Sequence, residues 1–478
     1  MSDTSECVTQ ALIIAAGQGS RLECGTPKPL QRVLGVPLLA RALFTFQRAG
    51  VIDVVVVVGH EAERVRSGMA QWSRAGLTVH WVFNPDWREP NGVSVLAAEG
   101  ELGGAFFLSM TDHLFQPHTV TALAQSGARG GINLAVDYQV DRVLNLDDAT
   151  KVRVEDGRIG AIGKSLNEYD AIDTGVFLTS PSLFEAIRAA RANGEASLSA
   201  GVQRLAENGR AWVTDIEGAM WQDVDTPADL AEARRKLLAG VRKDSDGPVS
   251  RYLNRTLSIA LSRLLVNTPV TPNQISVSTL VISLVSAGFA VGGGYLNFLV
   301  AGVLFQIASI VDGTDGEVAK LKFQTSHRGE WIDTVCDSVS YLAFLVGLII
   351  GVHRSGLPSF YALAGIAGFV AAVASITNLS SSVARQKNSG SFLSVQYGYE
   401  DGIGWGRRFM RAVHFMGKRD LFAFLAMLLS VVGQLPLALP LFGVGATLLL
   451  FPATSQANMS SWLRHRRGRV PNLTSSDY

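Results

Sequence analysis

Hydrophobic residues follow two different patterns along this 478-residue chain. In the first half, short apolar runs such as ALIIAA (11–16), VVVVVG (54–59) and FFLSMTD (106–112) alternate with amphipathic stretches such as PLLARALFTFQRAG (37–50). Such runs are typical of buried parallel strands, and the longer stretches between them are typical of helices. The pattern predicts an α/β doubly wound domain over residues 1–240, in which ligands bind where the strands end.

From Ile275 onward the chain consists mainly of long uncharged runs, which read as membrane spans. Residues 273–470 are therefore expected to form an all-α six-span integral membrane domain. The predicted spans are 275–291, 295–311, 333–353, 360–380, 420–434 and 436–453.

Residues 241–272 join the two halves. RKDSDGPVS (242–250) has the charge density and turn residues of a linker. In the following segment, 250–270, Arg251, Arg255 and Arg263 stand among apolar residues at helical spacing. This pattern fits an amphipathic helix lying on the membrane surface, and equally a plain linker helix.

The connections between the predicted spans differ in charge. GGGYLN (292–297) and GQLPLALP (433–440) contain no Lys or Arg, whereas the opposite set of connections is basic. By the positive-inside rule, the protein is a multi-pass cell-membrane protein with both termini on the cytoplasmic side. A net charge of +1 gives no reason to expect a nucleic-acid partner. The basic set comprises Lys320, Lys322, Arg328, Arg385, Lys387, Arg407, Arg408, Arg411, Lys418, Arg419 and RHRRGR (464–469).

Four carboxylates stand at the boundary of two predicted spans: Asp312, Asp315, Asp333 and Asp337. Acidic residues at a membrane boundary are costly and therefore usually mark a functional site. The pairs are spaced i,i+3 and i,i+4, so on helices each pair shares one face. Two facing pairs are suited to hold two divalent cations that polarise a phosphoryl group.

This spacing resembles that of the CDP-alcohol phosphotransferase family, D-x2-D-G-x2-A-R-x8-G-x3-D-x3-D. The one departure is Lys320, where the family has Arg, so the planar fork that contacts phosphate is lost. The resemblance implies that the four acids bind metal and that Asp337 also acts as the base. It further implies nucleotide contacts by Gly316, Ala319, Lys320 and Gly329.

A glycine-rich loop, LIIAAGQGSRLECGTPKPL (12–30), follows the first predicted strand. Glycines let the backbone approach a triphosphate closely, although a GxG alone is also an ordinary tight turn. With Arg21 and the later PKPL, the loop resembles the sugar-phosphate nucleotidyltransferases, with a MobA-like domain. The resemblance implies that Lys28 steadies the triphosphate. The nucleotide would lie against Ala15, Ala16, Gly17, Gly19, Arg21 and Lys28.

Two further acids match the positions that bind metal in that family. Asp112 follows a predicted strand, and Asp225 precedes a helix that begins near Thr226 or Pro227. Taken alone, Asp225 is also a natural N-terminal helix cap. The resemblance implies one Mg²⁺ or Mn²⁺ in this site, which offsets charge at the reaction centre.

The segment DDATKVRVEDGRIGAIGKSLNEYDAIDTGVF (147–177) resembles CTP:inositol-1-phosphate cytidylyltransferases. The resemblance implies that Lys164 faces the substrate phosphate and that Glu168 and Asp173 accept hydrogen bonds from polyol hydroxyls. Alone, Lys164 would read as a solvated turn lysine. Asn84 and Asn91 are candidates for contacting the pyrimidine or ribose, although Asn91-Gly92 is otherwise a turn.

The order of the two domains resembles the bifunctional inositol-1-phosphate cytidylyltransferase/di-myo-inositol phosphate phosphate synthase family. The resemblance implies that CTP and inositol 1-phosphate give CDP-inositol. A second inositol 1-phosphate then takes the phosphoinositol unit and CMP leaves. It also implies a homodimer through the membrane domain and both active sites on the cytoplasmic side.

Two other interpretations stay open at this point. One is a lipid-forming enzyme that passes another CDP-activated head group to a lipid alcohol. The other is a CDP-alcohol-binding protein with altered catalysis, for which Lys320 leaves room. Arg407, Arg408, Lys418 and Arg419 are candidates for binding the acceptor phosphate, or they serve only to set the membrane topology.

Overall fold

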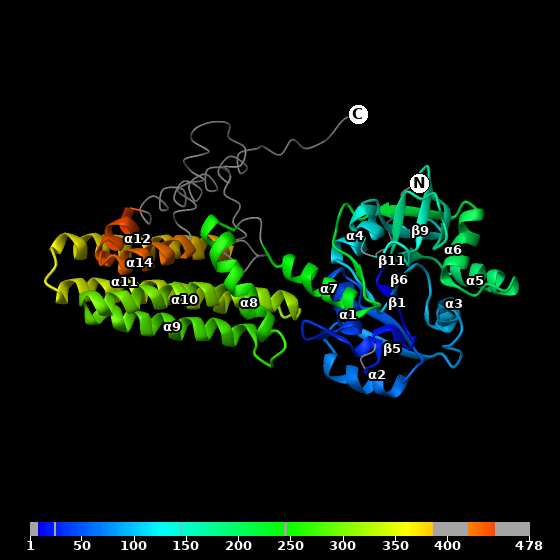
Figure 1. Ribbon diagram of the computed structural model, residues 1–478, viewed down its shortest axis with the longest axis horizontal. Coiled ribbons are helices and arrows are strands. Elements are labelled where there is room, and N and C mark those ends of the chain that lie inside the picture. The colour runs from blue at the N-terminus through cyan, green and yellow to red at the C-terminus, as the bar shows by residue number, and fades with distance from the viewer. Residues whose placement is uncertain (1–7, 23–24, 144, 243–245, 386–418, 445–478) are drawn as a thin grey trace, which may run out of the picture. The chain divides into compact units, whose positions relative to one another are not determined.

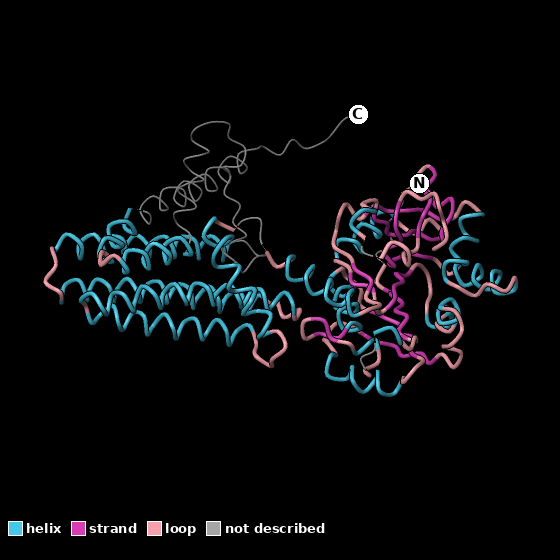
Figure 2. The backbone as a smooth tube through the Cα atoms, in the orientation of Figure 1, coloured by secondary structure: helices cyan, strands magenta, loops and turns pink. Residues whose placement is uncertain are grey.

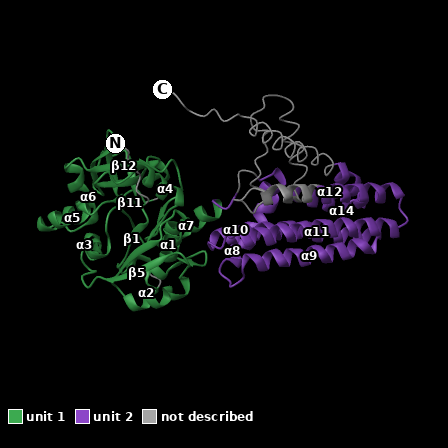
Figure 3. Cartoon of the chain, turned by 180° about the vertical axis from the view of Figure 1, so that it is seen from behind, with its two compact units in different colours: residues 1–239 green, residues 240–478 purple. Residues whose placement is uncertain are grey.

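The structure, a computed structural model, describes residues 8–22, 25–143, 145–242, 246–385 and 419–444. The chain divides into two compact units, residues 1–239 and 240–478 (Figures 1 and 3). The first unit combines strands and helices, whereas the described part of the second is helical (Figure 2).

The first unit is built on a nine-stranded sheet with the order β5-β4-β1-β6-β11-β8-β12-β10-β9. The sheet strands are β1 (Gln10–Ala15), β4 (Asp53–Val58), β5 (Thr78–Phe83), β6 (Phe106–Met110), β8 (Ile132–Asp137), β9 (Lys151–Glu155), β10 (Arg158–Gly163), β11 (Ala171–Thr179) and β12 (Ala211–Asp215). Two short pairs stand apart from it: β2 (Arg32–Val33) with β3 (Val36–Pro37), and β7 (His113–Leu114) with β13 (Gln222–Asp223).

The predicted strands 11–16, 54–59 and 106–112 correspond to β1, β4 and β6. These three strands and β5 run parallel, so β1 and β6 end at the same edge of the sheet. The α/β class is confirmed, but the sheet is mixed, because β11 lies antiparallel between β6 and β8. The helices of this unit are α1 (Leu38–Arg48), α2 (Ala62–Met69), α3 (Asn91–Leu96), α4 (Pro117–Ser126), α5 (Ser182–Ala192), α6 (Leu198–Glu207) and α7 (Pro227–Ala239).

Helices of the second unit continue beyond the predicted spans. The structure contains α9 (Pro272–Gly292), α10 (Gly294–Leu321) and α11 (His327–Arg354), each long and apolar enough to cross a membrane. Helix α10 passes the predicted end at 311, and α11 begins before 333, so the acidic motif lies on helices. The other described helices are α8 (Arg255–Leu265), α12 (Ser359–Arg385) and α14 (Arg419–Val431).

The full number of spans remains a prediction. Helix α12 covers the predicted span 360–380, while α14 ends at Val431 within the span 420–434. The last predicted span, 436–453, extends outside the described residues.

Close backbone contact joins α9 to α11. A Cβ added to Gly351 would lie 1.9 Å from the carbonyl oxygen of Ala290, and one added to Gly347 would lie 2.5 Å from that of Ala287. Small residues permit such approach between helices in a membrane, where packing rather than water exclusion drives association. Helix α10 joins this core through Phe305, whose ring stacks on Phe344 of α11 with centroids 4.1 Å apart.

The arginine-bearing segment before α9 forms a short π-helix (Ser250–Asn254) followed by α8. The segment is amphipathic, as its sequence predicts. A helix lying on the membrane surface would expose its arginines, but Arg255 does not lie on the outer surface. Arg255 is buried, whereas Tyr252 and Leu264 are 78% and 70% exposed. One polar side of this segment, formed by Asn254, Arg255, Ser258 and Ser262, is therefore buried against the protein, whereas Arg251 and Arg263 are exposed together with apolar side chains.

Candidate active sites

The glycine-rich loop connects β1 to Lys28 at the carboxyl edge of the sheet. Ala15 and Ala16 are buried, and the Ala16 carbonyl accepts a hydrogen bond from the His60 amide at 3.0 Å. Gly19 has a φ of +63°, and a Cβ there would lie 2.6 Å from the Cβ of Lys28. A Cβ on Gly17 would meet nothing within 4 Å, which leaves room beside the loop.

Lys28 is held between two carboxylates. Its Nζ lies 2.5 Å from Oδ2 of Asp112 and also pairs with Oδ1 of Asp225. Burial lowers the pKa of Lys28, but the charges of Asp112 and Asp225 outweigh burial and raise it. The loop therefore carries a permanent positive charge between the two acids that the sequence predicted as metal ligands.

Asp225 also pairs with a second basic side chain. Its Oδ2 lies 2.7 Å from Nη2 of Arg21, so both of its oxygens pair with basic side chains. The helix-cap interpretation of Asp225 is wrong, because Thr226 and Asp229 supply the cap of α7. The Asp229 carboxylate accepts from the Thr226 amide at 2.8 Å, and Thr226 Oγ1 accepts from the Asp229 amide at 3.2 Å.

Asp148, which the sequence did not single out, extends this row of charges. One of its oxygens lies 2.6 Å from Nη1 of Arg21, and the other lies 2.6 Å from Nζ of Lys164. Hydrogen bonds from Lys164 and Arg21 lower the pKa of Asp148. The predicted substrate lysine is thereby connected to the glycine-rich loop, in a row in which basic and acidic groups alternate. The row runs Lys164, Asp148, Arg21, Asp225, Lys28, Asp112.

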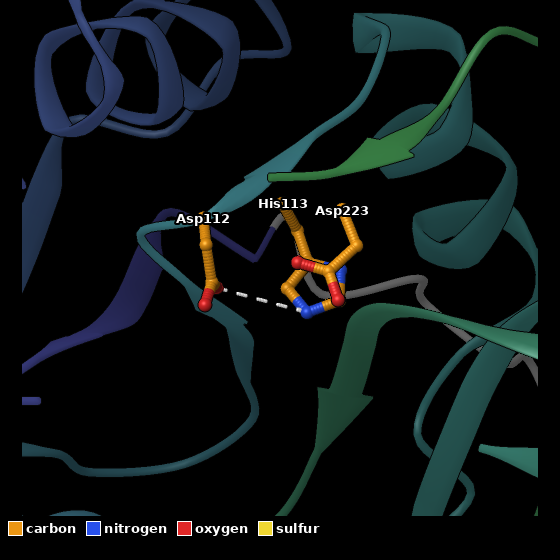
Figure 4. A group of neighbouring side chains, drawn as sticks. All are labelled: Asp112, His113 and Asp223. Atoms are coloured by element: carbon orange, nitrogen blue, oxygen red, sulfur yellow. Dashed lines mark ion pairs between the residues drawn. The ribbon is translucent and has the colours of Figure 1, made fainter. Parts of the chain in front are cut away.

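A second group of polar side chains surrounds the other oxygen of Asp112, since its Oδ1 lies 3.7 Å from Nε2 of His113 (Figure 4). The β7–β13 pairing places Asp223 opposite His113, next to Asp112 in the chain. One ligand atom from each of these three residues lies within 4.8 Å of the others. Asp112 Oδ1, His113 Nδ1 and Asp223 Oδ1 are buried without a hydrogen-bond partner. Buried carboxylate and imidazole atoms this close together fit a divalent cation.

The electrostatics of this group also reflect its burial. Burial raises the pKa of Asp223 to about 6. Burial lowers the pKa of His113, but the charges of Asp223 and Asp112 raise it more. Burial raises the pKa of Asp112, yet the charge of Lys28 brings it below its ordinary value. Sequence reasoning missed His113 and Asp223, although two acids two residues apart in WQDVDTP were a visible signal.

The remaining predicted substrate residues lie apart from one another. Glu168 is exposed in the turn between β10 and β11. Asp173 lies on β11, where its Oδ1 accepts a hydrogen bond from the Gly175 amide at 2.6 Å. Burial raises the pKa of Asp173 to about 6, and its charge acts on His113.

The two predicted base-contacting amides are both bound to the protein. Asn84 is buried, donates to Ser94 Oγ at 3.0 Å and accepts from the Asp86 amide at 2.9 Å. Asn91 begins α3 and accepts from the Leu198 amide at 2.9 Å. These contacts give both side chains a role in holding the loop around α3.

In the helical unit, three carboxylates meet where α10 and α11 approach. Oxygens of Asp312, Asp315 and Asp333 lie within 4.8 Å of one another. Asp315 is buried, and its Oδ2 accepts a hydrogen bond from Ser276 Oγ of α9 at 2.6 Å. Three acids this close favour a bound cation, because their charges repel one another.

The other motif residues lie along the same two helices. Asp337 is partly buried one turn beyond Asp333, on the same face of α11. Gly316 and Lys320 are exposed on α10, whereas Ala319 is buried. Gly329 donates its amide to Ser326 Oγ at 3.1 Å, which caps the start of α11. Lys322 donates to the carbonyls of Thr268 and Val270, so it fastens the turn before α9.

Comparison with known proteins defines the class of each unit. Residues 11–211 match the family described as MobA-like NTP transferase domain. Residues 269–451 match the family described as CDP-alcohol phosphatidyltransferase. The chain is therefore an enzyme that joins a nucleotidyltransferase domain to a membrane-type CDP-alcohol transferase domain, as the sequence predicted.

Relatives with both domains are similar over most of their length. The chain is 39% identical to the bifunctional IPC transferase and DIPP synthase of Rubrobacter xylanophilus, over 74% of this chain and 80% of the relative. It is 34% identical to the protein of that name from Thermococcus kodakarensis, over 76% and 80%. The solved inositol-1-phosphate CTP transferase of T. maritima is 26% identical over 48% of this chain and 94% of that one, with a TM-score of 0.44. The chain belongs to the family of bifunctional IPC transferases and DIPP synthases.

The packing of His113 gives a direct test of the first site. Gly175 has a φ of +74°, and a Cβ there would lie 2.3 Å from His113 Nδ1. Gly157 has a φ of +73° with nothing near its Cβ position. We expect Gly157→Ala to cost about 1–2 kcal/mol, the cost of left-handed backbone alone. Gly175→Ala should cost clearly more, because the methyl group must also displace His113.

Thermal unfolding of the two variants, followed by tryptophan fluorescence, measures the difference. Equal losses of stability would mean that His113 is not fixed against Gly175.

Proposed function

We propose that this chain catalyses two consecutive reactions. The first makes CDP-inositol and pyrophosphate from CTP and inositol 1-phosphate. The second transfers the phosphoinositol unit to another inositol 1-phosphate and releases CMP. The observation that carries the proposal is that each of the two transferase domains has its own cluster of acidic side chains. Relatives with the same two domains, bifunctional by name, support it and favour it over a lipid-forming enzyme.

In the first reaction, a phosphate oxygen of inositol 1-phosphate attacks the α-phosphorus of CTP, and pyrophosphate leaves. Arg21 and Lys28 bind the triphosphate, while Lys164 binds the phosphate of the attacking substrate. Asp148 and Asp225 hold these basic groups in a row before the substrates arrive, which reduces the reorganisation needed on binding. Glu168 and Asp173 would accept hydrogen bonds from the polyol.

One Mg²⁺ or Mn²⁺ would offset negative charge at this reaction centre. Asp112 is the ligand that both the sequence and the structure point to. We place Asp223 and His113 beside it, because one side-chain ligand atom of each of the three residues lies within 4.8 Å of the others. Asp225, the ligand expected from the sequence, is better placed to hold Arg21 and Lys28.

In the second reaction, a hydroxyl of the acceptor inositol 1-phosphate attacks the β-phosphoryl group of CDP-inositol. Asp337 takes the proton from that hydroxyl, and CMP is the leaving group. Lys320 contacts phosphate, and Gly316, Ala319 and Gly329 line the nucleotide. Two divalent cations held by Asp312, Asp315, Asp333 and Asp337 would stabilise the attacking and leaving oxygens.

The lipid bilayer is the surrounding partner of the helical unit. Both active sites and both termini would face the cytoplasm, as the basic connections indicate. The unit would form a homodimer. Of the basic residues considered for the acceptor phosphate, Arg407, Arg408 and Lys418 lie outside the described residues.

Two substitutions separate the reactions. With CTP, inositol 1-phosphate and Mg²⁺, Asp337→Asn should accumulate CDP-inositol without the phosphorylated di-inositol product, because the second site loses its base and a metal ligand while the first site is unchanged. Asp112→Asn should form neither product, since the second step has no substrate. Mass spectrometry of the products measures both, and adding CDP-inositol to Asp112→Asn should restore the second product. If Asp337→Asn still makes that product, Asp337 is not the base.

The two acids of WQDVDTP have different expected roles. In a chain whose membrane-unit site carries Asp315→Asn, Asp223→Asn should weaken Mn²⁺ binding roughly ten- to hundredfold. Asp225→Asn should keep the Mn²⁺ affinity but raise the KM for CTP, because Arg21 and Lys28 lose their shared partner. Electron paramagnetic resonance measures free and bound Mn²⁺. If Asp225→Asn weakened Mn²⁺ binding and Asp223→Asn did not, Asp225 would be the metal ligand instead.

A further inference from the structure

A buried glutamate lies within the acidic motif but is not part of the cluster of Asp312, Asp315 and Asp333. Glu317 of α10 is 1% exposed, two residues after Asp315. Three donors of α8 surround it. Its Oε1 accepts from Arg255 Nη1 at 2.7 Å and Ser258 Oγ at 2.6 Å, and its Oε2 accepts from Ser262 Oγ at 2.6 Å. A buried carboxylate with this many partners is fixed in place.

Arg255 binds on three sides. Its Nε and Nη2 donate to the two oxygens of Asp246 at 2.8 and 3.0 Å. Its Nη1 reaches both Glu317 and, at 3.5 Å, the carbonyl of Gly313. The guanidinium fork therefore joins the segment before α8 to two points on α10, one on each side of Asp315.

The geometry of α10 gives this contact a consequence for the acids. Gly313 and Glu317 are four residues apart and so lie on one face of the helix, toward α8. At about 3.6 residues per turn, that face points roughly 150° away from the midpoint of Asp312 and Asp315. Helix α8 thus holds the side of α10 opposite the carboxylates.

The contact with α8 would oppose a rotation of α10. Asp312, Asp315 and Asp333 repel one another, and a small rotation of α10 would relieve the repulsion by separating them. The hydroxyl of Ser276 holds Asp315 by a hydrogen bond of 2.6 Å. Other hydrogen bonds hold α10 further toward its start, from Gln306 to Asn254 and from Ser286 to the Ala301 carbonyl, whereas Arg255 contacts the turn that carries the acids.

We propose that Arg255 is a positioning residue for the phosphotransferase site. Through Glu317 and Gly313 it sets the rotation of α10, so that Asp312 and Asp315 face Asp333 of α11 at metal-binding distance. The inference rests on the proposed function of the helical unit, although it does not depend on which alcohol that unit uses.

The test compares variants of the full chain in detergent, with the first reaction as an internal control. Arg255→Met should lower kcat of the second reaction, measured with supplied CDP-inositol, roughly ten- to hundredfold. The rate of CDP-inositol formation should stay unchanged, because that site lies in the other unit. Arg255→Lys should recover part of the second activity, since it keeps the charge but not the fork. Arg263→Met is the matched control, an exposed arginine of the same helix, and should leave both rates unchanged.

A second readout does not use activity. In a chain with both Asp112→Asn and Asp223→Asn, which removes the two carboxylates of the first metal site, Mn²⁺ binding reports the membrane unit. Arg255→Met should weaken this binding, seen by electron paramagnetic resonance, while Arg263→Met should not. If Arg255→Met fails to give a single size-exclusion peak, Arg255→Lys carries the same test with a smaller loss.

Equal Mn²⁺ affinity and equal second-step rates in Arg255→Met and the wild type would overturn the inference. If Arg255→Lys had the same Mn²⁺ affinity and second-step rate as the wild type, the guanidinium fork would not be needed. Arg255 would then have a purely structural role. Absence of the second product from the wild type would instead contradict the proposed function, and the Mn²⁺ comparison would still decide the role of Arg255.

Discussion

Mutual repulsion of carboxylates is the constraint on which both sites of this protein depend. Each unit brings acidic groups closer than their charges favour, and each must compensate for this within the fold. In the first unit, Lys28 lies between Asp112 and Asp225. In the second, a hydroxyl from α9 and the packing of two long helices hold three aspartates together. The compensation stays incomplete, which makes both groups of acids suited to hold a divalent cation.

The two units compensate in different ways, which match their surroundings. The nucleotidyltransferase site lies at the edge of a sheet, where loops bring basic and acidic side chains into an alternating row. Several members of this row are exposed, so entering phosphates can replace carboxylates as partners of Arg21 and Lys164. In the described part of the helical unit, the acids of the second site lie on helices rather than loops. Its acids are fixed by helix positions, and precise geometry there comes from packing, from Ser276 and from the contact between Arg255 and Glu317.

Local patterns predicted what local physics determines. The runs of Val and Ile gave β1 and β4, and the spacing of the four aspartates placed each pair on one helix face. Asp148 and His113 could not be chosen from the sequence in this way, and the only local signal of Asp223 was its two-residue spacing from Asp225. Their roles arise from distant pairings, such as that of β7 with β13, which no local period reports.

The direction of α8 was also beyond the sequence. Its arginines and serines recur at helical spacing, but spacing does not say whether the polar face meets water or protein. Near a membrane the usual orientation can be reversed, because lipid accepts the apolar face. The partner that decides the orientation, Glu317, lies 62 residues further along the chain from Arg255.

Tracing phosphorus atoms tests the two-reaction proposal most directly. With CTP labelled at the α-phosphorus, all label should leave as CMP and none should enter the di-inositol product. With labelled inositol 1-phosphate, the label should appear in both the phosphodiester and the terminal phosphate of that product. Label from the α-phosphorus of CTP in the phosphodiester, or product formed without CMP, would contradict transfer through CDP-inositol.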